Sequence, residues 1–492
     1  MTVVHDVTAA TLAEEVDRRL SDGYRMAMLA GHEDDDCFRV VYVLVRGDGS
    51  GDRCELVLRT GNEQPTIPSL AAVDYSAGRF EREIRDLFGI TPTGHPLQAR
   101  LVRHGHWPRG WYPMRRDADS EPVFDPDVGS FPFLEVAGEG VYEIPVGPVH
   151  AGLIEPGHFR FSVVGETILR MKARLWFVHR GIEKLFEGRR PADGIELAER
   201  ISGDTAVGHT LAYVTAVESA LGIEVADRDL LLRAALLELE RMHNHVADLG
   251  ALASDVGYSI INVHALRLRE SLLRLNKQTT GHRLLRGGIT VGGAHTLALP
   301  DVDLVASVAS EVSELATLTL ANSTVRDRFT GTAILGPDEA RGLGTLGYVA
   351  RGSGLDVDAR RDHPFTDLGE HFSVVVETGG DVLARYRVRV RELAVSAAVL
   401  TDLVHRLDDH RGTGVTADMN RGGSGLGLVE GWRGTIAHRV ELDTNGVLSR
   451  VKIVDPSFFN WPALPVALAD TIVPDFPLAN KSFNQSYAGN DL

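Results

Sequence analysis

Residues 179–187 hold five ionisable side chains among apolar neighbours that include Trp176, Phe177 and Phe186; the five are His179, Arg180, Glu183, Lys184 and Glu187. If the stretch is helical, Glu183 and Glu187 share one face, and His179 lies one turn before Glu183. A carboxylate that is desolvated in such surroundings has a raised pKa and can relay protons. The alternative is an amphipathic helix whose charges all face water.

This region also carries a resemblance to a known family. RGIEKLFEGRRPADG, from Arg180, and ERISGDTAVGHTLAY, from Glu199, resemble the large subunit of nickel-iron hydrogenases. They resemble equally the D subunit of respiratory NADH-quinone oxidoreductase, which has the same fold without the metal. The chain also has a segment similar to the respiratory C subunit before this D-type part, and this is the domain order of the formate hydrogenlyase large subunit and its membrane-bound hydrogenase relatives. The resemblance therefore implies an oxidoreductase subunit.

The residues at the nickel-binding positions of that family differ here. The R-x-C-G-x-C motif is Arg200-Ile201-Ser202-Gly203-Asp204-Thr205, and the terminal D-P-C-x-x-C motif runs from Asp455 to Asn460. The four cysteine positions hold Ser202, Thr205, Ser457 and Asn460. Hydroxyl groups have pKa values too high to replace thiolates as anionic soft ligands, and an amide cannot replace them either. We therefore expect no nickel, although the resemblance leaves magnesium possible at Glu183, because the matching hydrogenase glutamate binds it.

Other matches imply a site for a quinone-type acceptor. The D subunit has a histidine before its first strand that meets the quinone; GPVHAGLIEPGHFRF, from Gly147, offers His158 as the favoured match and His150 as the second. Gly203 stands where the D subunit has a tyrosine. Arg351, in RGSGLDVDAR, matches a family arginine that points into the cavity. We therefore expect one cavity whose proton-carrying residues are His158, Glu183, Asp204, His209 and Arg351, and whose acceptor-binding residues are His158, His150 and Gly203.

The N-terminal part resembles a second respiratory subunit. FEREIRDLFGITPTGHP, from Phe80, and WYPMRRD, from Trp111, resemble in the same order the signature segments of the C subunit. In its own complex the C subunit holds no cofactor and docks against the D subunit. The resemblance implies a C-type domain fused to a D-type domain.

The elements that must position these residues divide the chain into three parts. Residues 1–120 predict a small α/β domain with strand-like runs from Cys37 and Cys54, and residues 121–146 a linker rich in proline and acids. Residues 147–492 predict a large, mainly helical bundle with peripheral β-hairpins, including one turning at Asn445-Gly446. The fold class is therefore α+β. The tract VLARYRVRVREL, from Val382, alternates like a strand, but the family makes it helical.

Composition limits the remaining possibilities. The net charge is −17 without a basic tract, so nucleic acid is not an expected partner. No run of eighteen apolar residues and no signal peptide is present, and the two cysteines fit a reduced cytoplasmic protein.

The sequence therefore predicts a subunit that lies on the cytoplasmic side of the cell membrane, peripheral to it. The expected partners are an iron–sulfur small subunit, which would hold the cluster, and membrane subunits that include antiporter-like ones. An acceptor such as quinone would be reduced in a cavity that relays protons. The alternative is a catalytically inert scaffold between the iron–sulfur subunit and ion-translocating membrane subunits.

Overall fold

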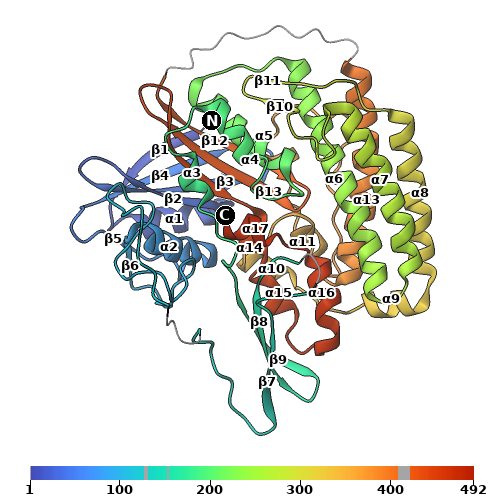
Figure 1. Cartoon of the computed structure of the whole chain (residues 1–492), viewed down its shortest axis with the longest axis horizontal. Coiled ribbons are helices and arrows are strands. Elements are labelled where there is room, and N and C mark those ends of the chain that lie inside the picture. Colours follow the sequence, from blue (N-terminus) through green and yellow to red (C-terminus); the bar gives the residue numbers. More distant parts are fainter. Residues whose placement is uncertain (1, 127–130, 152–153, 408–420) are drawn as a thin grey trace.

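A computed structural model of the whole chain describes residues 2–126, 131–151, 154–407 and 421–492. Figure 1 shows an N-terminal sheet unit on the left, a three-stranded sheet in the centre and a helical bundle on the right. The predicted α+β class is confirmed, because long helices and several small sheets alternate along the chain.

The N-terminal unit is a four-stranded sheet in the order β1-β4-β3-β2, covered by two helices. Strand β1 pairs parallel with β4, whereas β2, β3 and β4 are antiparallel. The second helix is capped by Asp74 and ends at Gly89, whose φ of 77° is the left-handed conformation that glycine adopts readily. The elements are β1 (Thr2–Val7), α1 (Leu12–Ser21), β2 (Tyr24–Glu33), β3 (Phe38–Arg46), β4 (Arg53–Thr60), β5 (Thr66–Pro68), α2 (Tyr75–Phe88) and β6 (Thr91–Thr93).

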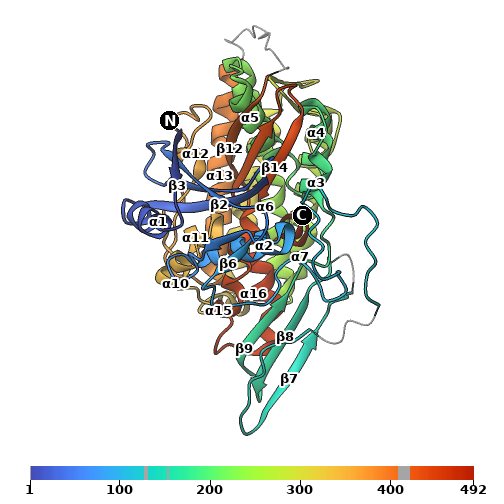
Figure 2. The same cartoon turned by 90° about the vertical axis from the view of Figure 1, so that its left-hand side faces the viewer.

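A three-stranded antiparallel sheet opens the second part of the chain. It consists of β7 (Val141–Val146), β8 (His158–Val164) and β9 (Thr167–Arg174), with β8 in the middle. Figures 1 and 2 show that this sheet projects below the rest of the molecule. In β8, Phe159, Phe161 and Val163 are buried on one face, as the alternation of side chains in a strand requires.

The ionisable stretch at 179–187 is not one helix. Gly181 adopts a left-handed conformation with a φ of 67°, so α3 (Ile182–Phe186) starts after it and is followed by α4 (Pro191–Ala198). His179 therefore precedes the helix, and the predicted helical turn between His179 and Glu183 is wrong. Pro191 begins α4 at the first helical position, where its missing N–H costs nothing.

The bundle consists of α6 (Asp227–Asp255), α7 (Ser259–Thr280), α8 (Val302–Ala321) and α13 (Val382–Leu407). The tract from Val382 is therefore helical, as the family resemblance implied. Within α6, Gly250 lies against Ala265 and Asn262 of α7, where a side chain would collide. This glycine allows close helix packing and does not end the helix.

Helix α8 is the one helix among the described residues that is long and apolar enough to cross a membrane. Its most apolar window has a mean hydropathy of 1.3 and is 28% buried. A core helix of a soluble protein passes the same test, and α8 packs against α7 and α13 at the edge of the bundle. It is weak support for a membrane span.

The central sheet lies between the N-terminal unit and the bundle (Figure 1). It contains β12 (Gly423–Gly431), β13 (Gly434–Leu442) and β14 (Leu448–Val454), all antiparallel, and α5 (Ala206–Leu221) packs on β12 and β13. The predicted hairpin at Asn445-Gly446 is present between β13 and β14. This sheet joins the two predicted domains.

Short elements complete the fold and bring the C-terminal residues back to the centre of the molecule. They are β10 (Ile289–Thr290), β11 (Gly293–Ala294), α9 (Ser323–Phe329), α10 (Pro337–Gly342), α11 (Gly347–Gly352), α12 (Ala359–Asp362), α14 (Pro456–Asn460), α15 (Ala463–Ala467), η1 (Val473–Asp475), α16 (Phe476–Phe483) and α17 (Tyr487–Asp491).

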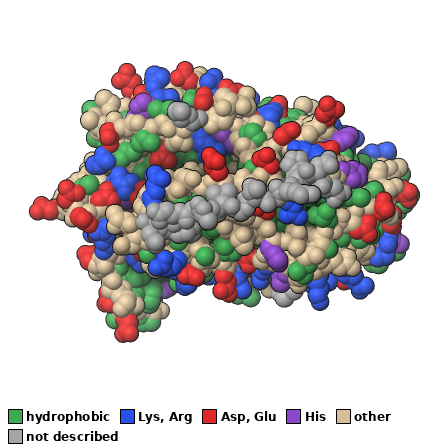
Figure 3. Space-filling view, turned by 90° about the horizontal axis from the view of Figure 1, so that it is seen from above, with side chains coloured by type: hydrophobic (Ala, Val, Ile, Leu, Met, Phe, Trp, Pro, Cys, Tyr) green, Lys and Arg blue, Asp and Glu red, His purple; other side chains and the backbone are tan. Residues whose placement is uncertain are grey.

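The surface carries charges of both signs. On the face shown in Figure 3, acidic and basic side chains are interspersed.

Candidate functional site

The turn before α5 holds two of the four former cysteine positions, Ser202 and Thr205, and both are 2% exposed. The Ser202 hydroxyl donates to Asp204 Oδ1 (3.0 Å) and lies 2.8 Å from the Ser486 hydroxyl. The Thr205 hydroxyl also donates to Asp204 Oδ1, at 3.0 Å, and accepts from Trp432 Nε1 at 3.1 Å. Both hydroxyls are therefore engaged in hydrogen bonds within the protein.

The other two former cysteine positions lie on α14 and are fully buried. Ser457 Oγ accepts the backbone N–H of Ser486 at 2.9 Å. The Asn460 amide pairs with the backbone of Leu346, accepting from its N–H at 2.8 Å and donating to its carbonyl at 3.1 Å. Neutral oxygens and an amide that are already hydrogen-bonded do not fit nickel, which this family binds through thiolates.

A cavity of about 620 Å³ opens beside the Ser202–Asp204 turn. Its walls come from the loop before β8, from β8 itself, from that turn and from the C-terminal helices. Its lining includes Val146, His150, Ile154, Glu155, Phe159, Ser202, Gly203, Asp204, Asp255, Arg433, Phe476, Lys481, Asn484, Ser486 and Tyr487. The size and the mixture of apolar walls with a few polar groups are typical of a site for a small organic ligand.

The strongest polar contact in this cavity is the ion pair of Asp204 with Arg433. Two parallel hydrogen bonds of 2.7 Å join the guanidinium to the carboxylate, and the guanidinium also lies 3.9 Å from the Trp432 ring centre. Burial opposes ionisation of Asp204, but Arg433 outweighs it and holds the pKa of that carboxyl below its usual range. Asp204 is therefore held as a carboxylate, and its two hydrogen bonds orient Arg433.

Asp255, at the C-terminal end of α6, also lines the cavity. Partial burial raises its pKa, although Lys481 acts in the opposite direction. A carboxyl with a raised pKa that faces a ligand cavity can donate a proton. The sequence analysis missed Asp255 and Arg433; the only signal was their position where an element ends, Asp255 as the last residue of α6 and Arg433 in the turn after β12.

The two candidate histidines lie on different sides of β8. His150 lines the cavity and its Nε2 donates to the Gly157 carbonyl at 2.9 Å. His158 lies on the face of β8 opposite to Phe159, which is a cavity residue, and its ring contacts Phe133 with centroids 4.9 Å apart. Because successive side chains of a strand point to opposite faces, the favoured residue His158 points away from the cavity.

Glu183 lies away from this cavity, in the seam between α3, β14 and the N-terminal unit. Its oxygens accept from Arg450 (2.7 Å), Lys452 (3.0 Å) and the Ile453 N–H (3.0 Å). Burial would raise the pKa of Glu183, but the two cations outweigh burial and lower it to about 2. The predicted rise in its pKa is wrong.

The same contacts test the magnesium site. Both oxygens of Glu183 are already neutralised by Arg450 and Lys452, so the residues present do not fit an additional divalent cation. Within the part of the chain that the structure describes, no group of three or more His, Cys, Asp or Glu side chains could hold a metal ion.

His209 lies behind the cavity wall in a buried hydrogen-bonded row. Its Nε2 is 3.0 Å from Asp455 Oδ2 and its Nδ1 is 3.1 Å from His438 Nε2. Burial lowers the pKa of His438 well below its usual value. Asp455 also caps α14 through the Ser457 N–H at 2.7 Å. This row fixes α14 against α5 and β13, and His209 does not line the cavity.

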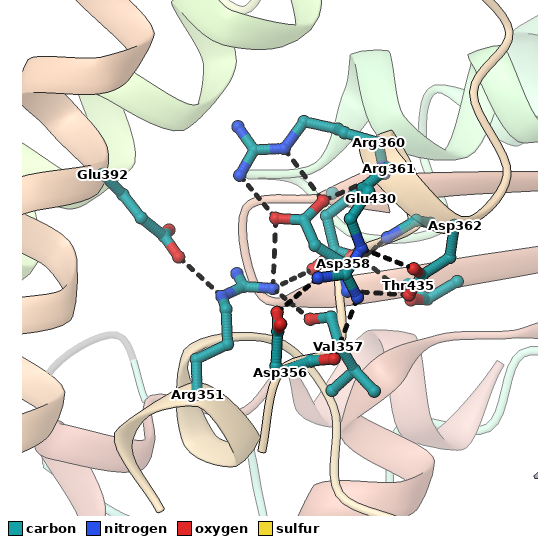
Figure 4. Close-up of polar contacts among 12 residues, drawn as sticks. Arg351, Asp356, Val357, Asp358, Arg360, Arg361, Asp362, Glu392, Glu430 and Thr435 are labelled. Carbon is teal, nitrogen blue, oxygen red and sulfur yellow. Dashed lines mark hydrogen bonds and ion pairs between the residues drawn. The ribbon is translucent and has the colours of Figure 1, made fainter. Parts of the chain in front are cut away.

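Arg351 is fully buried in a separate charged cluster (Figure 4). Its Nε donates to Glu392 (2.7 Å), and its Nη1 donates to Glu430 (2.7 Å) and to the Val357 carbonyl (2.9 Å). The other carboxylate oxygen of Glu392, Oε2, lies 2.9 Å from His245 Nε2. Arg351 therefore points toward α13 and β12, and it does not line the cavity.

The structure thus brings together three of the predicted site residues and separates the rest. Gly203, Asp204 and His150 share the cavity, whereas His158, Glu183, His209 and Arg351 lie elsewhere. The sequence carries only a partial signal for the two cations that pair with Glu183. Arg450 and Lys452 alternate with apolar residues in β14, and this pattern places both on one face of a strand.

Comparisons with known families match three segments of the chain. Residues 5–123 match the respiratory-chain NADH dehydrogenase 30 Kd subunit, and residues 255–421 match the 49 Kd subunit. Residues 180–254 match the nickel-dependent hydrogenase family. The fold and the cavity thus define the class of hydrogenase-related large subunits fused to a C-type domain.

Individual relatives agree. The chain is 33% identical to formate hydrogenlyase subunit 5 of Escherichia coli, over 92% of this chain and 82% of that protein. It is 29% identical to the fused C/D subunit of NADH-quinone oxidoreductase from Phocaeicola vulgatus, over 71% of this chain and 72% of that protein. A chain of the membrane-bound sulfane sulfur reductase, an archaeal respiratory membrane complex, superimposes with a TM-score of 0.66 at 25% identity, covering 73% of this chain and 100% of that one.

The chain belongs to the family of formate hydrogenlyase subunit 5 and the fused NADH-quinone oxidoreductase C/D subunits. The expectation taken from the sequence motifs is thereby confirmed.

Proposed function

We propose that this protein is the large subunit of a membrane-associated, hydrogenase-related electron-transfer complex, and that it binds a small organic electron acceptor of the quinone class without nickel. The observation that carries the proposal is the cavity of about 620 Å³ beside the Ser202–Asp204 turn, where the former nickel positions hold hydrogen-bonded hydroxyl and amide groups.

The walls of the cavity suit an acceptor with an apolar ring and polar oxygens. Phe159, Phe476 and Tyr487 supply aromatic surface, and Arg433, already oriented by Asp204, supplies a guanidinium edge. A guanidinium held in place can stabilise negative charge that develops on an acceptor oxygen during reduction. His150 and Asp255 line the same cavity and are the proposed proton donors.

The partners are proposed from exposed apolar surface and from the relatives. Val149 and Ile154, in the loop that borders the cavity, are 86% and 55% exposed. Large apolar side chains that lie exposed beside a site are typical of a surface covered by another protein. We place an iron–sulfur subunit here, as electron donor, with membrane subunits that include antiporter-like ones and hold the chain at the cytoplasmic face of the membrane.

The experiment fills the cavity without disturbing its walls. A Cβ at Gly203 would meet no atom within 4 Å, so the side chain of Gly203→Trp extends into open space. We expect the assembled complex to form normally but to lose acceptor reduction at least tenfold, whereas Gly203→Ala keeps most activity. Gly61→Trp, at another open glycine far from the cavity, is the matched control.

Two outcomes contradict the proposal. If Gly203→Trp leaves turnover of the assembled complex unchanged, the cavity is inert and the protein is a scaffold between an iron–sulfur subunit and ion-translocating membrane subunits. Near-stoichiometric nickel in this subunit, found by elemental analysis of the complex isolated from its membrane, contradicts the acceptor site without nickel.

A further inference from the structure

A second, smaller cavity lies in the seam between the N-terminal unit and the large unit. It measures about 30 Å³, and Glu83, Trp176, His179, Glu183, Lys184 and Asp491 contribute to its walls. This volume holds one or two water molecules and nothing larger. It lies on the far side of α17 from the acceptor cavity, because Tyr487 and Ala488 of the same segment line that one.

Glu83, on α2 of the N-terminal unit, is 7% exposed, and its two carboxylate oxygens differ in their hydrogen bonding. Its Oε1 accepts from Lys452 Nζ at 2.8 Å. Its Oε2 is buried and has no hydrogen-bond partner among the described residues. A buried carboxylate oxygen without a partner is costly, whereas a protonated one can donate to a water molecule in the cavity.

Glu83 shares the cation Lys452 with a second carboxyl group, Glu183. Lys452 and Arg450 face two carboxyl groups, Glu83 and Glu183, and Glu183 also accepts the Ile453 N–H. Asp491, which lines the same cavity, adds a third carboxyl group. Burial raises the pKa of Glu83; Lys452 opposes this shift and neighbouring Glu183 reinforces it. Glu183 therefore has more cationic and N–H partners than Glu83 has.

His179 lines the same cavity as Glu83. Its Nδ1 lies 2.7 Å from the Asp491 carbonyl, which can only accept, so Nδ1 carries the hydrogen and Nε2 is the acceptor of the neutral ring. Burial lowers the pKa of His179, which keeps the ring neutral. Burial likewise raises the pKa of Asp491 to about 6.

We propose that the seam cavity is a proton-holding site in which Glu83 of the N-terminal unit carries an exchangeable proton on Oε2 and passes it through one water molecule to His179. The O–H bond of Glu83 breaks as the water takes the proton, and the water gives one of its own protons to His179 Nε2. Glu83 is then a carboxylate paired with Lys452. The N-terminal unit thereby supplies a titrating group and does more than stiffen the assembly.

The first test measures the proton directly on the purified full-length chain. Infrared difference spectra of wild type minus Glu83→Gln should show the carbonyl stretch of a protonated carboxyl group, shifted in D₂O. Glu143→Gln is the control, because its carboxylate is paired with Lys172 and Arg160 and should contribute no such band. Absence of the band from the wild-type minus Glu83→Gln spectrum at neutral pH would overturn the proposal.

The second test measures thermal stability, because the protonated and the ionised form of Glu83 predict changes in Tm of opposite sign for Glu83→Gln. An acid with a raised folded-state pKa loses stability as pH rises from its unfolded value, about 4.3, through its folded value. Glu83→Gln resembles the protonated acid. Its Tm should therefore equal that of wild type at neutral pH and exceed that of wild type as the pH rises further. If the Tm of Glu83→Gln is lower than that of wild type at neutral pH but not in acid, Glu83 is an ion-paired carboxylate, and the proposal is wrong.

The role of this site in turnover rests on the proposed function, but neither test depends on it. If Gly203→Trp fails to stop acceptor reduction while the Glu83 band is present, only the acceptor site is refuted. In the assembled complex, Glu83→Gln should slow proton-coupled turnover at least tenfold and flatten its pH profile. Unchanged turnover and an unchanged profile would contradict the exchange step.

Discussion

At the scale of residues, the partners of a buried carboxylate decide its protonation. Glu183 and Glu83 lie in one seam and share Lys452, but only Glu183 also has Arg450 and a backbone N–H. The same logic separates Asp204, which is ionised by Arg433, from Asp255, whose pKa is raised by burial. Residue type alone does not distinguish these cases.

The lowered pKa of Glu183 predicts a specific dependence of stability on pH. Its folded-state pKa of about 2 lies below the usual value of 4.5, so its contribution is complete above about pH 4.5 and is lost as pH falls toward 2. We expect Glu183→Gln to cost about 3 kcal/mol at pH 7, because Arg450 and Lys452 lose a buried counter-charge. Chemical unfolding of wild type and Glu183→Gln between pH 7 and 3 measures the difference in their free energies of unfolding.

Two results would contradict this role of Glu183. A stability gap that stays constant down to pH 3 would mean that its charge is not what stabilises the seam. A variant as stable as wild type at pH 7 would mean that the cations are not buried counter-charges. Glu187→Gln is the control, since Glu187 pairs with the half-exposed Lys184 on the surface.

At the scale of elements, the close packing of α5 on β12 positions the Ser202–Asp204 turn. Ala212, Ala216 and Ala220 of α5 recur every four residues and lie over Gly427, Gly425 and Gly423 of β12. A Cβ on any of these glycines would overlap a carbonyl oxygen of the helix. Glycines leave this face of the strand without side chains and alanines keep the helix face small, so the helix and strand backbones come into contact.

This packing predicts that Gly427→Ala is strongly destabilising. The new methyl group meets backbone that cannot move as a side chain can, so we expect a loss of about 3 kcal/mol, at the upper end of the cost of overpacking. Thermal unfolding of the full chain measures it. Ser424→Ala, at an exposed position of the same strand, should change little; equal Tm values for the two variants would show that the backbones of α5 and β12 are not in close contact.

At the scale of the whole molecule, the N-terminal unit and the large unit form one body. Phe80 of α2 stacks on Phe458 of α14 with ring centroids 4.4 Å apart, and one hydrophobic core includes residues from both units. Buried ion pairs cross the same boundary: Arg439 of β13 meets Glu55 of β4 at 3.1 Å, and Arg39 of β3 meets Glu441 at 2.9 Å. The two units therefore share a hydrophobic core and ion pairs.

The crossing ion pairs predict coupling between the units. Arg439→Met should destabilise the whole chain by about 3–5 kcal/mol, because it leaves Glu55 buried without its cation. The double variant Glu55→Gln and Arg439→Met should recover part of the loss, since no charge then remains unpaired. Thermal unfolding followed by two probes, one for each unit, should show a single transition; two separate transitions in wild type would contradict the single body.

The sequence by itself determined much of the fold. The motifs around Arg180, Glu199, Phe80 and Arg351 were enough to predict the family, because such motifs hold many residues in a fixed order. Local signals placed the hairpin at Asn445-Gly446, since tight turns are decided by neighbouring residues. The replacement of the four cysteine positions is likewise visible without a structure.

Only the tertiary structure decided which of the predicted residues meet. The strand pleat turns His158 away from the cavity that Phe159 lines, and Gly181 separates His179 from α3. Arg433, Arg450 and Lys452 reach the candidate carboxylates from more than two hundred residues away along the chain. Their long-range pairing sets the pKa values of Asp204 and Glu183, and sequence spacing does not encode it, because electrostatic interactions depend on distance in space.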